Sequence, residues 1–368
     1  MKIAILGTRG IPNHYGGFEQ FAEYLSVGLV ERGHDVTVYN SHSHPYTKDE
    51  FKGVKIKHIY DPENRIGTAG QFIYDLLCIV DTRKCDYDII LQLGYTSSSI
   101  FFDLHPKKSI VVTNMDGLEW KRTKYSAKVQ KFLQWAESLA AKKSDFMISD
   151  SIGIQNYIKN KYQKDTVFIP YGAYTIETYD EMVCSEYKIE SYEYDMLIAR
   201  LEPENSIEII LDGVVKSSKK RIFLVIGNHE TKYGLYLKEK YNANKNIIFI
   251  GGVYDQSKLN NLRNFSNIYF HGHTVGGTNP SLLEAMGSKA LICANDNEFN
   301  KAILGEDAFY FNSAEDVVSI MDTINKNEYN GLIENNMKKI KTIYNWENII
   351  DQYEKYLLQC SQINKNNI

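Results

Sequence analysis

The chain lacks any apolar run approaching the roughly 20 residues that a helix needs to cross a bilayer. Its first residues, "MKIAILGTRG", also carry too short an apolar run for a signal peptide. These absences argue against an integral membrane protein or a secreted one, while contact with a membrane surface stays open. We therefore expect a soluble, cytoplasmic protein.

Cysteine is scarce, and its spacing forms no metal or disulfide pattern. The five cysteines are Cys78, Cys85, Cys184, Cys293 and Cys360. Their number is odd, they are widely spaced and no two form a CxxC pair, so neither a disulfide framework nor a zinc cluster is expected. The histidines His14, His271 and His273 are too scattered to indicate a metal site. We expect free thiols, no metal and no other cofactor.

A strong positive charge is also missing. The net charge of −4 argues against a general nucleic-acid binder, so nucleic acid is not an expected partner. The composition, 43% hydrophobic and 24% charged, is typical of a globular protein. A chain of 368 residues is too long for one ordinary core and favours two domains of about 150 residues each.

Strand-like and helix-like segments alternate from the first residue. Buried strands are predicted at "KIAIL", "DVTVYN", "YDIILQL", "SIVVTN", "DFMISD" and "VFIPYG", and the spacing of apolar residues in "FEQFAEYLSVGLVERG" predicts a helix. An acidic, tyrosine-rich segment at 174–195 breaks the pattern. Strands then resume at "MLIARL", "RIFLVIGN", "NIIFIGG", "NIYFHG", "ALICAN" and "AFYF".

This alternation predicts an α/β fold with two doubly wound parallel sheets. We place the first domain at 1–172 and the second at 173–344. A closing amphipathic helix at 345–361 has no strand after it, and we expect it to pack across the domain junction and join the first domain.

The first strand is followed by "GTRGIPNHYGGFEQ", a glycine-rich turn. Its GxxG spacing and the ending of the second strand in Tyr39-Asn40 disfavour a nicotinamide-dinucleotide site, which needs GxGxxG and an acid. Gly16 and Gly17 precede a helix start, where bare backbone N–H groups together with Arg9 suit an anion. The alternative is a loop that needs glycine only for a positive φ.

The second domain's first strand ends in Arg200, where open α/β sheets place their ligands. An arginine there suits a diphosphate, which it can hold with paired charge-assisted hydrogen bonds. The alternative is a surface ion pair with Glu202 or Glu204.

The stretch "HGHTVGGTNPSLLEAMGSKALICA" combines a glycine pair with a helix start. Asn279 fits the N-cap, and Pro280 fits the first helical position. The helix therefore begins beside Gly276-Gly277, with Glu284 one turn inside. A helix start of this kind suits phosphate, and a nearby carboxylate suits a ribose diol, so the pair indicates a nucleoside diphosphate.

A third stretch, "NMDGLEWKRTKYSAKVQKFLQWAESLAAKK", places Asp116 at a strand's carboxyl end, followed by Glu119. In the helix after it, one stripe carries Lys124, Lys128, Lys131 and Trp135. Lysines with a tryptophan suit an anionic membrane surface that carries a lipid-linked acceptor. The alternative is a solvated lysine face.

Taken together, "ARLEPEN", "LVIGN", "IIFIGGVYD" and "GGTNPSLLEAMGSKALICA" resemble family 4 of the retaining, metal-independent glycosyltransferases of the GT-B fold. The N-terminal "GTRGIPNHYGGFEQFAEYLS" and "NMDGLEWKR" are similar to a subgroup that includes bacterial rhamnosyltransferases. The resemblance implies two Rossmann-like domains facing a cleft, with a C-terminal crossover helix. It implies catalytic roles for Arg200 and Asp116, and acceptor-side roles for Glu119 and Tyr15. The donor-binding residues it implies are Arg9, Gly16, Gly17, Gly227, Gly252, Val253, Gly277, Thr278, Asn279 and Glu284.

Two positions depart from that family. Its usual donor-sugar glutamate, eight residues before Glu284, is Gly276 here, and its diphosphate lysine, five residues after Arg200, is Asn205. The lost glutamate fits a deoxysugar better than an ordinary hexose.

The expected activity is therefore retaining transfer of L-rhamnose from dTDP-β-L-rhamnose onto a lipid-linked saccharide, in capsule or cell-surface polysaccharide synthesis at the inner face of the cell membrane. Three alternatives stay open: another UDP-, GDP- or dTDP-sugar as donor, a GT-B sugar-nucleotide epimerase, and an inactive nucleotide-sugar-binding protein.

Overall fold

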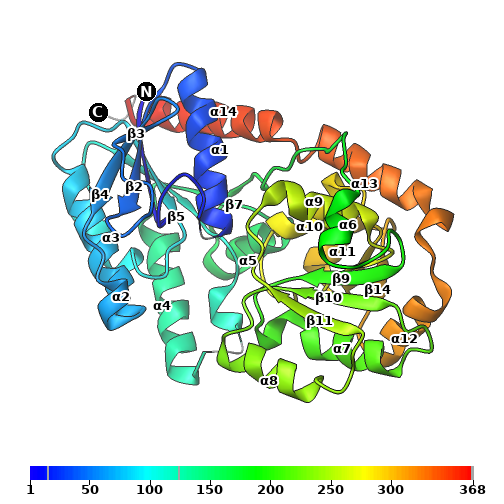
Figure 1. Ribbon diagram of the computed structural model, residues 1–368. Coiled ribbons are helices and arrows are strands. Elements are labelled where there is room, and N and C mark those ends of the chain that lie inside the picture. The colour runs from blue at the N-terminus through cyan, green and yellow to red at the C-terminus, as the bar shows by residue number, and fades with distance from the viewer. Residues whose placement is uncertain (15, 123–124, 366–368) are drawn as a thin grey trace. The chain divides into compact units, whose positions relative to one another are not determined.

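The computed structural model describes residues 1–14, 16–122 and 125–365. It divides into two compact units (Figure 1). Unit 1 comprises Met1–Trp120, Ala127–Tyr171 and Trp346–Ile368, and unit 2 comprises Lys121–Ser126 and Gly172–Asn345. None of the described helices is both long and apolar enough to span a bilayer.

Among the described residues, unit 1 contains an eight-stranded sheet with the strand order β3-β4-β2-β1-β5-β6-β7-β8. The strands are β1 (Lys2–Leu6), β2 (Asp35–Ser41), β3 (Glu50–Phe51), β4 (Val54–Ile59), β5 (Ile89–Leu93), β6 (Ile110–Asn114), β7 (Phe146–Ser149) and β8 (Val167–Phe168). All strand pairs are parallel except the β3–β4 hairpin. The six predicted strands of this unit are confirmed, and the hairpin was not predicted.

The helices of unit 1 cover this sheet, and the last of them comes from the far end of the chain. They are α1 (Gly17–Glu31), α2 (Glu63–Ile66), α3 (Ala69–Thr82), α4 (Ala127–Lys143), α5 (Ile152–Tyr162) and α14 (Trp346–Lys365), with 3-10 turns η1 (Ser99–Leu104) and η2 (Glu119–Lys121). Figure 1 shows α14 beside α1, and a Cβ added at Gly28 of α1 would lie 2.5 Å from the Ile350 side chain. The Phe21 ring packs against Tyr353, with centroids 5.1 Å apart. Residues 346–365 therefore complete the core of unit 1.

Among the described residues, unit 2 contains a six-stranded sheet in which all strands are parallel, with the order β11-β10-β9-β12-β13-β14. Its strands are β9 (Tyr194–Ile198), β10 (Ile222–Ile226), β11 (Ile247–Gly251), β12 (Tyr269–His271), β13 (Ile292–Asn295) and β14 (Phe309–Phe311). Its helices and turns are α6 (Met182–Glu186), η3 (Pro203–Asn205), α7 (Ile207–Lys216), α8 (Lys232–Lys240), α9 (Gln256–Phe265), α10 (Pro280–Gly287), α11 (Glu298–Leu304), α12 (Ala314–Thr323), η4 (Lys326–Glu328) and α13 (Asn330–Thr342). Because helices cover both faces, the strands read as continuous apolar runs, which is why sequence alone located all six.

The strand order fixes where each sheet can bind a ligand. In unit 2 the chain moves from β9 outward to β10 and β11, then returns to the other side of β9 with β12. In unit 1 the same reversal occurs between β1 and β5. Open α/β sheets bind ligands beyond the carboxyl ends of the strands at such a reversal. The residues that follow β9 and β12 are therefore the first place to look for a site in unit 2.

Candidate functional site

Arg200 follows β9 at the reversal point of unit 2, and its side chain is exposed. The predicted alternative, an ion pair with Glu202 or Glu204, is absent among the described residues. Glu204 instead lies 3.5 Å from Arg122, which belongs to the Lys121–Ser126 segment of the same unit. Asn205 is buried, and its side-chain amide donates to the Arg200 carbonyl oxygen at 2.7 Å. Asn205 thus shapes the backbone of Arg200, while the exposed guanidinium keeps its charge at the sheet edge.

Two stacked histidines, on the β12 side of the reversal, line the same edge. The rings of His271 and His273 lie 4.4 Å apart between centroids. Gly272 separates them because a Cβ there would lie 2.0 Å from the Asn205 carbonyl oxygen. Burial, and then the charges of Arg200 and Arg122, lower the pKa of His273 to about 3. Burial also lowers the pKa of His271 well below its usual value, so both rings are neutral at neutral pH.

The start of α10 has the geometry predicted from sequence. Asn279 has extended backbone, and its side-chain oxygen accepts the Ser281 N–H at 2.9 Å, with Pro280 as the first helical residue. Gly276 has a φ of +139°, in the range that favours glycine, and a Cβ there would meet no atom within 4 Å. Thr278 is buried directly before the cap. The helix therefore begins at the edge where β12 ends, as an anion site requires.

Glu284 of α10 is held by a buried arginine that sequence analysis did not identify. Arg263 of α9 is 1% exposed, and its Nη2 lies 2.7 Å from the Glu284 Oε2. The same guanidinium donates to the side chains of Asn260 and Ser281 and lies 6.0 Å from the centre of the Tyr269 ring. The sequence did contain a sign that Arg263 is buried: it stands four residues after the buried Leu259 and so lies on the same, apolar face of α9.

The remaining predicted donor residues of unit 2 lie at the carboxyl ends of β10 and β11. Gly227 follows β10, and a Cβ there would lie 2.1 Å from the Ala199 carbonyl oxygen, so only glycine fits. Gly252 and Val253 follow β11, with Gly252 next to the Tyr254 ring. The structure thus gathers Arg200, Gly227, Gly252, His273 and the α10 start at one edge of one sheet.

In unit 1, the glycine-rich turn after β1 already contains carboxylates. Gly16 has an extended φ of −169° and Gly17 opens α1, so neither needs a positive φ. Arg9 donates through Nε and Nη2 to Glu63 at 3.0 and 2.7 Å. Its backbone N–H donates to the buried Glu19 carboxylate at 2.8 Å. The charge of Arg9 is therefore engaged within unit 1, a pairing across 54 residues of sequence that no local pattern indicates.

Asp116 and Glu119 follow β6 and are both partly buried. The Asp116 N–H donates to the Asn114 side-chain oxygen at 3.0 Å, which fixes the turn after the strand. The predicted acceptor residue Tyr15 lies outside the described residues.

The segment after β6 is anchored by Glu137 of α4, which the sequence reasoning missed. Its buried carboxylate accepts hydrogen bonds from five side chains: Tyr95 (3.3 Å), Trp120 (3.1 Å), Tyr157 (2.8 Å), Lys161 (2.9 Å) and Tyr162 (2.6 Å). Tyr95 also donates to the Gly117 carbonyl oxygen at 3.4 Å. Glu137 thereby fixes the backbone that carries Asp116 and Glu119.

The predicted stripe on α4 is exposed where it is described. Lys128 and Lys131 face solvent, and the Trp135 side chain is 50% exposed. The fourth member, Lys124, lies outside the described residues.

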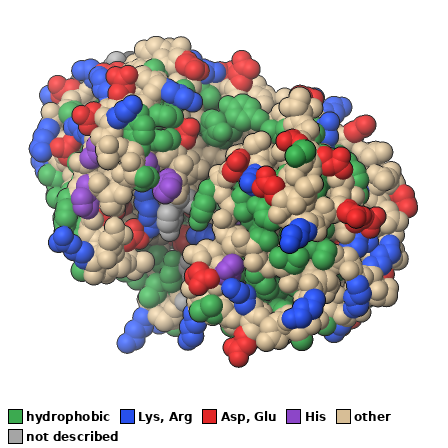
Figure 2. All heavy atoms as spheres, viewed as in Figure 1, with side chains coloured by type: hydrophobic (Ala, Val, Ile, Leu, Met, Phe, Trp, Pro, Cys, Tyr) green, Lys and Arg blue, Asp and Glu red, His purple; other side chains and the backbone are tan. Residues whose placement is uncertain are grey.

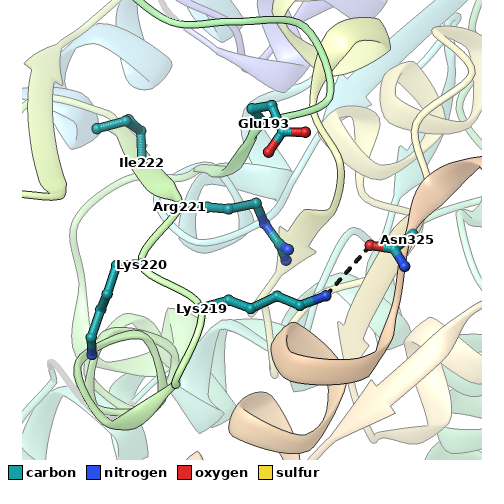
Figure 3. Close-up of a pocket in the computed structure, with 6 residues that line it drawn as sticks. All are labelled: Glu193, Lys219, Lys220, Arg221, Ile222 and Asn325. Atoms are coloured by element: carbon teal, nitrogen blue, oxygen red, sulfur yellow. Dashed lines mark hydrogen bonds between the residues drawn. The ribbon is translucent and has the colours of Figure 1, made fainter.

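A cavity of about 510 Å³ lies at the opposite edge of the unit 2 sheet, where β9 and β10 begin (Figure 3). Its cations already have structural partners. Lys219 points to Asn325, Lys220 donates to the Ser217 carbonyl oxygen, and Arg221 binds the buried Asp195 at 2.9 Å. This cavity is therefore separate from the candidate site around Arg200.

Two family models match the chain. Residues 1–174 match Domain of unknown function (DUF1972), and residues 187–343 match Glycosyl transferases group 1. The second match contains Arg200, Arg263 and Glu284.

Two curated proteins are similar over part of their length. Protein CapJ of Staphylococcus aureus is 29% identical over 144 residues, which are 38% of this chain and 36% of CapJ. An uncharacterized 42.6 kDa protein in the cps region of Klebsiella pneumoniae is 42% identical over 67 residues, 18% of this chain and 17% of that protein. The matched segments thus span about a third and about a sixth of these relatives.

The fold is similar to solved structures over nearly the whole chain. Sucrose-phosphate synthase from Thermosynechococcus elongatus gives a TM-score of 0.78 at 15% identity, covering 97% of this chain and 98% of that one. Anabaena HepE in complex with UDP and glucose gives 0.77 at 16%, covering 98% and 100%. A glycosyltransferase from Rickettsia africae ESF-5 gives 0.71 at 13%, covering 98% of each. The fold is GT-B, with two Rossmann-like units.

Proposed function

We propose that this chain, whose residues 187–343 match the glycosyl transferases group 1 family on a GT-B fold, is a retaining glycosyltransferase. The observation that carries the proposal is the gathering of Arg200, the α10 start and Glu284 at the reversal point of the unit 2 sheet. A cation and a helix N-terminus suit a diphosphate. A carboxylate one turn inside the helix suits the ribose of the same nucleotide.

In this proposal Arg200 and the α10 N-terminus hold the donor diphosphate. As the glycosidic bond breaks, negative charge grows on the departing nucleoside diphosphate, and fixed charges aimed at that position lower the barrier. The neutral ring of His273 beside Arg200 can donate or accept a hydrogen bond without adding charge. Glu284, oriented by Arg263, binds a ribose hydroxyl. No residue is assigned as a covalent nucleophile.

The proposed donor is dTDP-β-L-rhamnose. Its support is the N-terminal motif and the open space at Gly276, where the family resemblance places a sugar-binding glutamate. HepE, a structural neighbour, was solved with UDP and glucose, which supports a nucleotide-sugar ligand in general. A dTDP donor offers Glu284 one ribose hydroxyl, whereas UDP and GDP donors offer two. A donor panel must therefore include all three nucleotides.

The proposed acceptor is a lipid-linked saccharide in capsule or cell-surface polysaccharide synthesis. The names of the partial relatives, CapJ and a protein in a cps region, support this setting. The exposed Lys128, Lys131 and Trp135 of α4 support contact between unit 1 and an anionic inner-membrane surface. Asp116 and Glu119 are proposed to serve the acceptor side of the reaction.

The test is a donor panel of dTDP-, UDP- and GDP-sugars with a polyprenyl-linked saccharide. Sugar transfer that needs the acceptor, with release of nucleoside diphosphate, supports the proposal. Conversion of the nucleotide-sugar without acceptor identifies an epimerase instead.

A second candidate is an inactive nucleotide-sugar-binding protein. Two observations favour it: Gly276 offers no carboxylate, and Asn205 uses its amide on the Arg200 backbone in place of a diphosphate lysine. Donor binding without turnover under every acceptor condition selects this candidate.

A further inference from the structure

Helix α3 presents an apolar ridge to solvent. Ile73, Leu77 and Val80 follow the i, i+4, i+7 spacing of one helical face and are 40%, 37% and 41% exposed. Ile66 at the end of α2 extends the ridge and is 51% exposed. The opposite face of α3 carries the buried Tyr74, Asp75, Cys78, Ile79 and Thr82. The helix thus has a second apolar face with no covering element among the described residues.

Exposed cations flank this ridge at both ends, and the exposed carboxylate of Asp86 follows them in the chain. The exposed ionisable residues between 64 and 85 are Arg65, Arg83 and Lys84. The two carboxylates within α3 already have partners. Asp75 is buried and accepts a hydrogen bond from the Ser97 hydroxyl at 2.6 Å. Asp81 forms ion pairs with Lys57 at 2.6 Å and Lys84 at 2.9 Å. An apolar ridge with cations at its ends complements an anionic lipid surface.

The ridge is continuous with the stripe on α4. The Phe72 ring of α3 packs on Phe132 of α4 with centroids 5.7 Å apart, and Phe132 packs on Trp135 at 5.7 Å. Glu137, the acid of α4, is buried. The exposed carboxylate of Asp103, in η1, is paired with Lys143 of α4.

We propose that the outer face of α2–α3, formed by Ile66, Ile73, Leu77 and Val80, inserts into the interface of an anionic bilayer, with Trp135 as its aromatic margin. The inference rests on the proposed membrane contact of unit 1, but it assigns the apolar part of the attachment to a different helix from the lysine stripe. A second copy of the chain fits less well, because a symmetric contact would bring Arg65, Arg83 and Lys84 toward their own counterparts.

Flotation of the full chain with phosphatidylcholine vesicles containing about one third phosphatidylglycerol tests the proposal. The variant is Ile73→Gln with Leu77→Gln, and the matched control is Leu235→Gln on α8, a leucine 51% exposed in unit 2. We expect the ridge variant to lose about tenfold or more in partitioning and the control to match wild type. The ridge loss should persist at about 0.5 M salt, where surface charges are screened. Lys128→Gln with Lys131→Gln should instead lose binding only at low salt.

Three outcomes overturn the inference. Unchanged flotation of the ridge variant would remove the ridge from the attachment. Concentration-dependent dimers that the ridge variant abolishes reassign the face to a second copy. Failure of the wild type to float would rule out both proposed membrane contacts, the ridge and the lysine stripe on α4. Turnover with a short soluble acceptor separates these results from the fate of the proposed activity, because the ridge variant should keep wild-type turnover there.

Discussion

Arg263 fixes the carboxylate of Glu284: a guanidinium that is 1% exposed donates to Oε2 at 2.7 Å from the neighbouring helix. A buried ion pair of this kind contributes orientation more than net stability, because desolvation offsets much of the attraction. Its geometry gives the Glu284 carboxylate a set direction, suited to accept a hydrogen bond from a hydroxyl group.

Glu284→Gln should weaken nucleotide binding, because it removes the charged acceptor assigned to the ribose. Loss of a charged hydrogen bond is worth roughly 1.5–3 kcal/mol, or about ten- to a hundredfold in affinity. Calorimetry with dTDP and with its 3′-deoxy analogue measures the effect. Wild type should distinguish the two ligands and the variant should not; a variant that still distinguishes them contradicts the ribose assignment.

Arg200→Ala should reduce turnover more than donor binding, because charge grows on the diphosphate as the sugar leaves. A lost charge stabiliser of about 2–3 kcal/mol corresponds to roughly 30- to 150-fold in kcat. Lys219→Ala is the matched control, since that cation lies at the amino-terminal edge of the same sheet. Retention of more than about a tenth of wild-type turnover by Arg200→Ala would remove its proposed role.

Asp75 should make unit 1 less stable as pH rises through the acid range. Burial raises the pKa of Asp75 to about 6, although the Ser97 hydrogen bond lowers it. The folded state therefore keeps its proton between about pH 4 and 6, where the unfolded chain has lost it, so the free energy of unfolding falls as pH rises across that window. The contribution reaches at most about 3 kcal/mol.

Urea unfolding at about pH 4.5 and 7.5 measures this effect against Asp75→Asn, which cannot ionise. The stability difference between wild type and variant should change in the variant's favour as pH rises. Parallel pH dependence of the two proteins would show that Asp75 keeps an ordinary pKa in the folded state.

Glu137→Gln should destabilise unit 1, because five donors converge on its carboxylate and one of them is the Lys161 ammonium. We expect a loss of about 2–4 kcal/mol in the free energy of unfolding. Asp165→Asn is the control, since its ion pair with Lys159 is exposed and worth at most about 1 kcal/mol. Equal stabilities of the two variants would show that the converging bonds contribute little.

Features encoded in adjacent residues were predictable from the sequence, and those that depend on distant partners were not. Buried parallel strands appear as apolar runs, and the cap formed by Asn279 and Pro280 is a local pattern, so both were located correctly. The β3–β4 hairpin was missed because β3 has only two residues and because the strand prediction rested on continuous apolar runs, whereas β4 alternates apolar residues with lysine and histidine, the pattern of a half-buried strand. Likewise, the partners of Arg9 and Glu284 lie 54 and 21 positions away, and only the folded chain brings them together.

The return of α14 to unit 1 sets an order on biosynthesis. A ribosome completes the segment Gly172–Asn345 before it makes Trp346–Lys365, so the nascent chain can close its second core while the first still lacks Trp346, Ile350 and Tyr353. Until then Phe21 lacks the Tyr353 ring, and the Gly28 surface of α1 lacks the Ile350 side chain. An excised fragment that ends near residue 174, the limit of the first family match, would keep that apolar gap permanently. Grafting residues 346–365 behind residue 171 would supply the missing helix and give a self-sufficient amino-terminal domain.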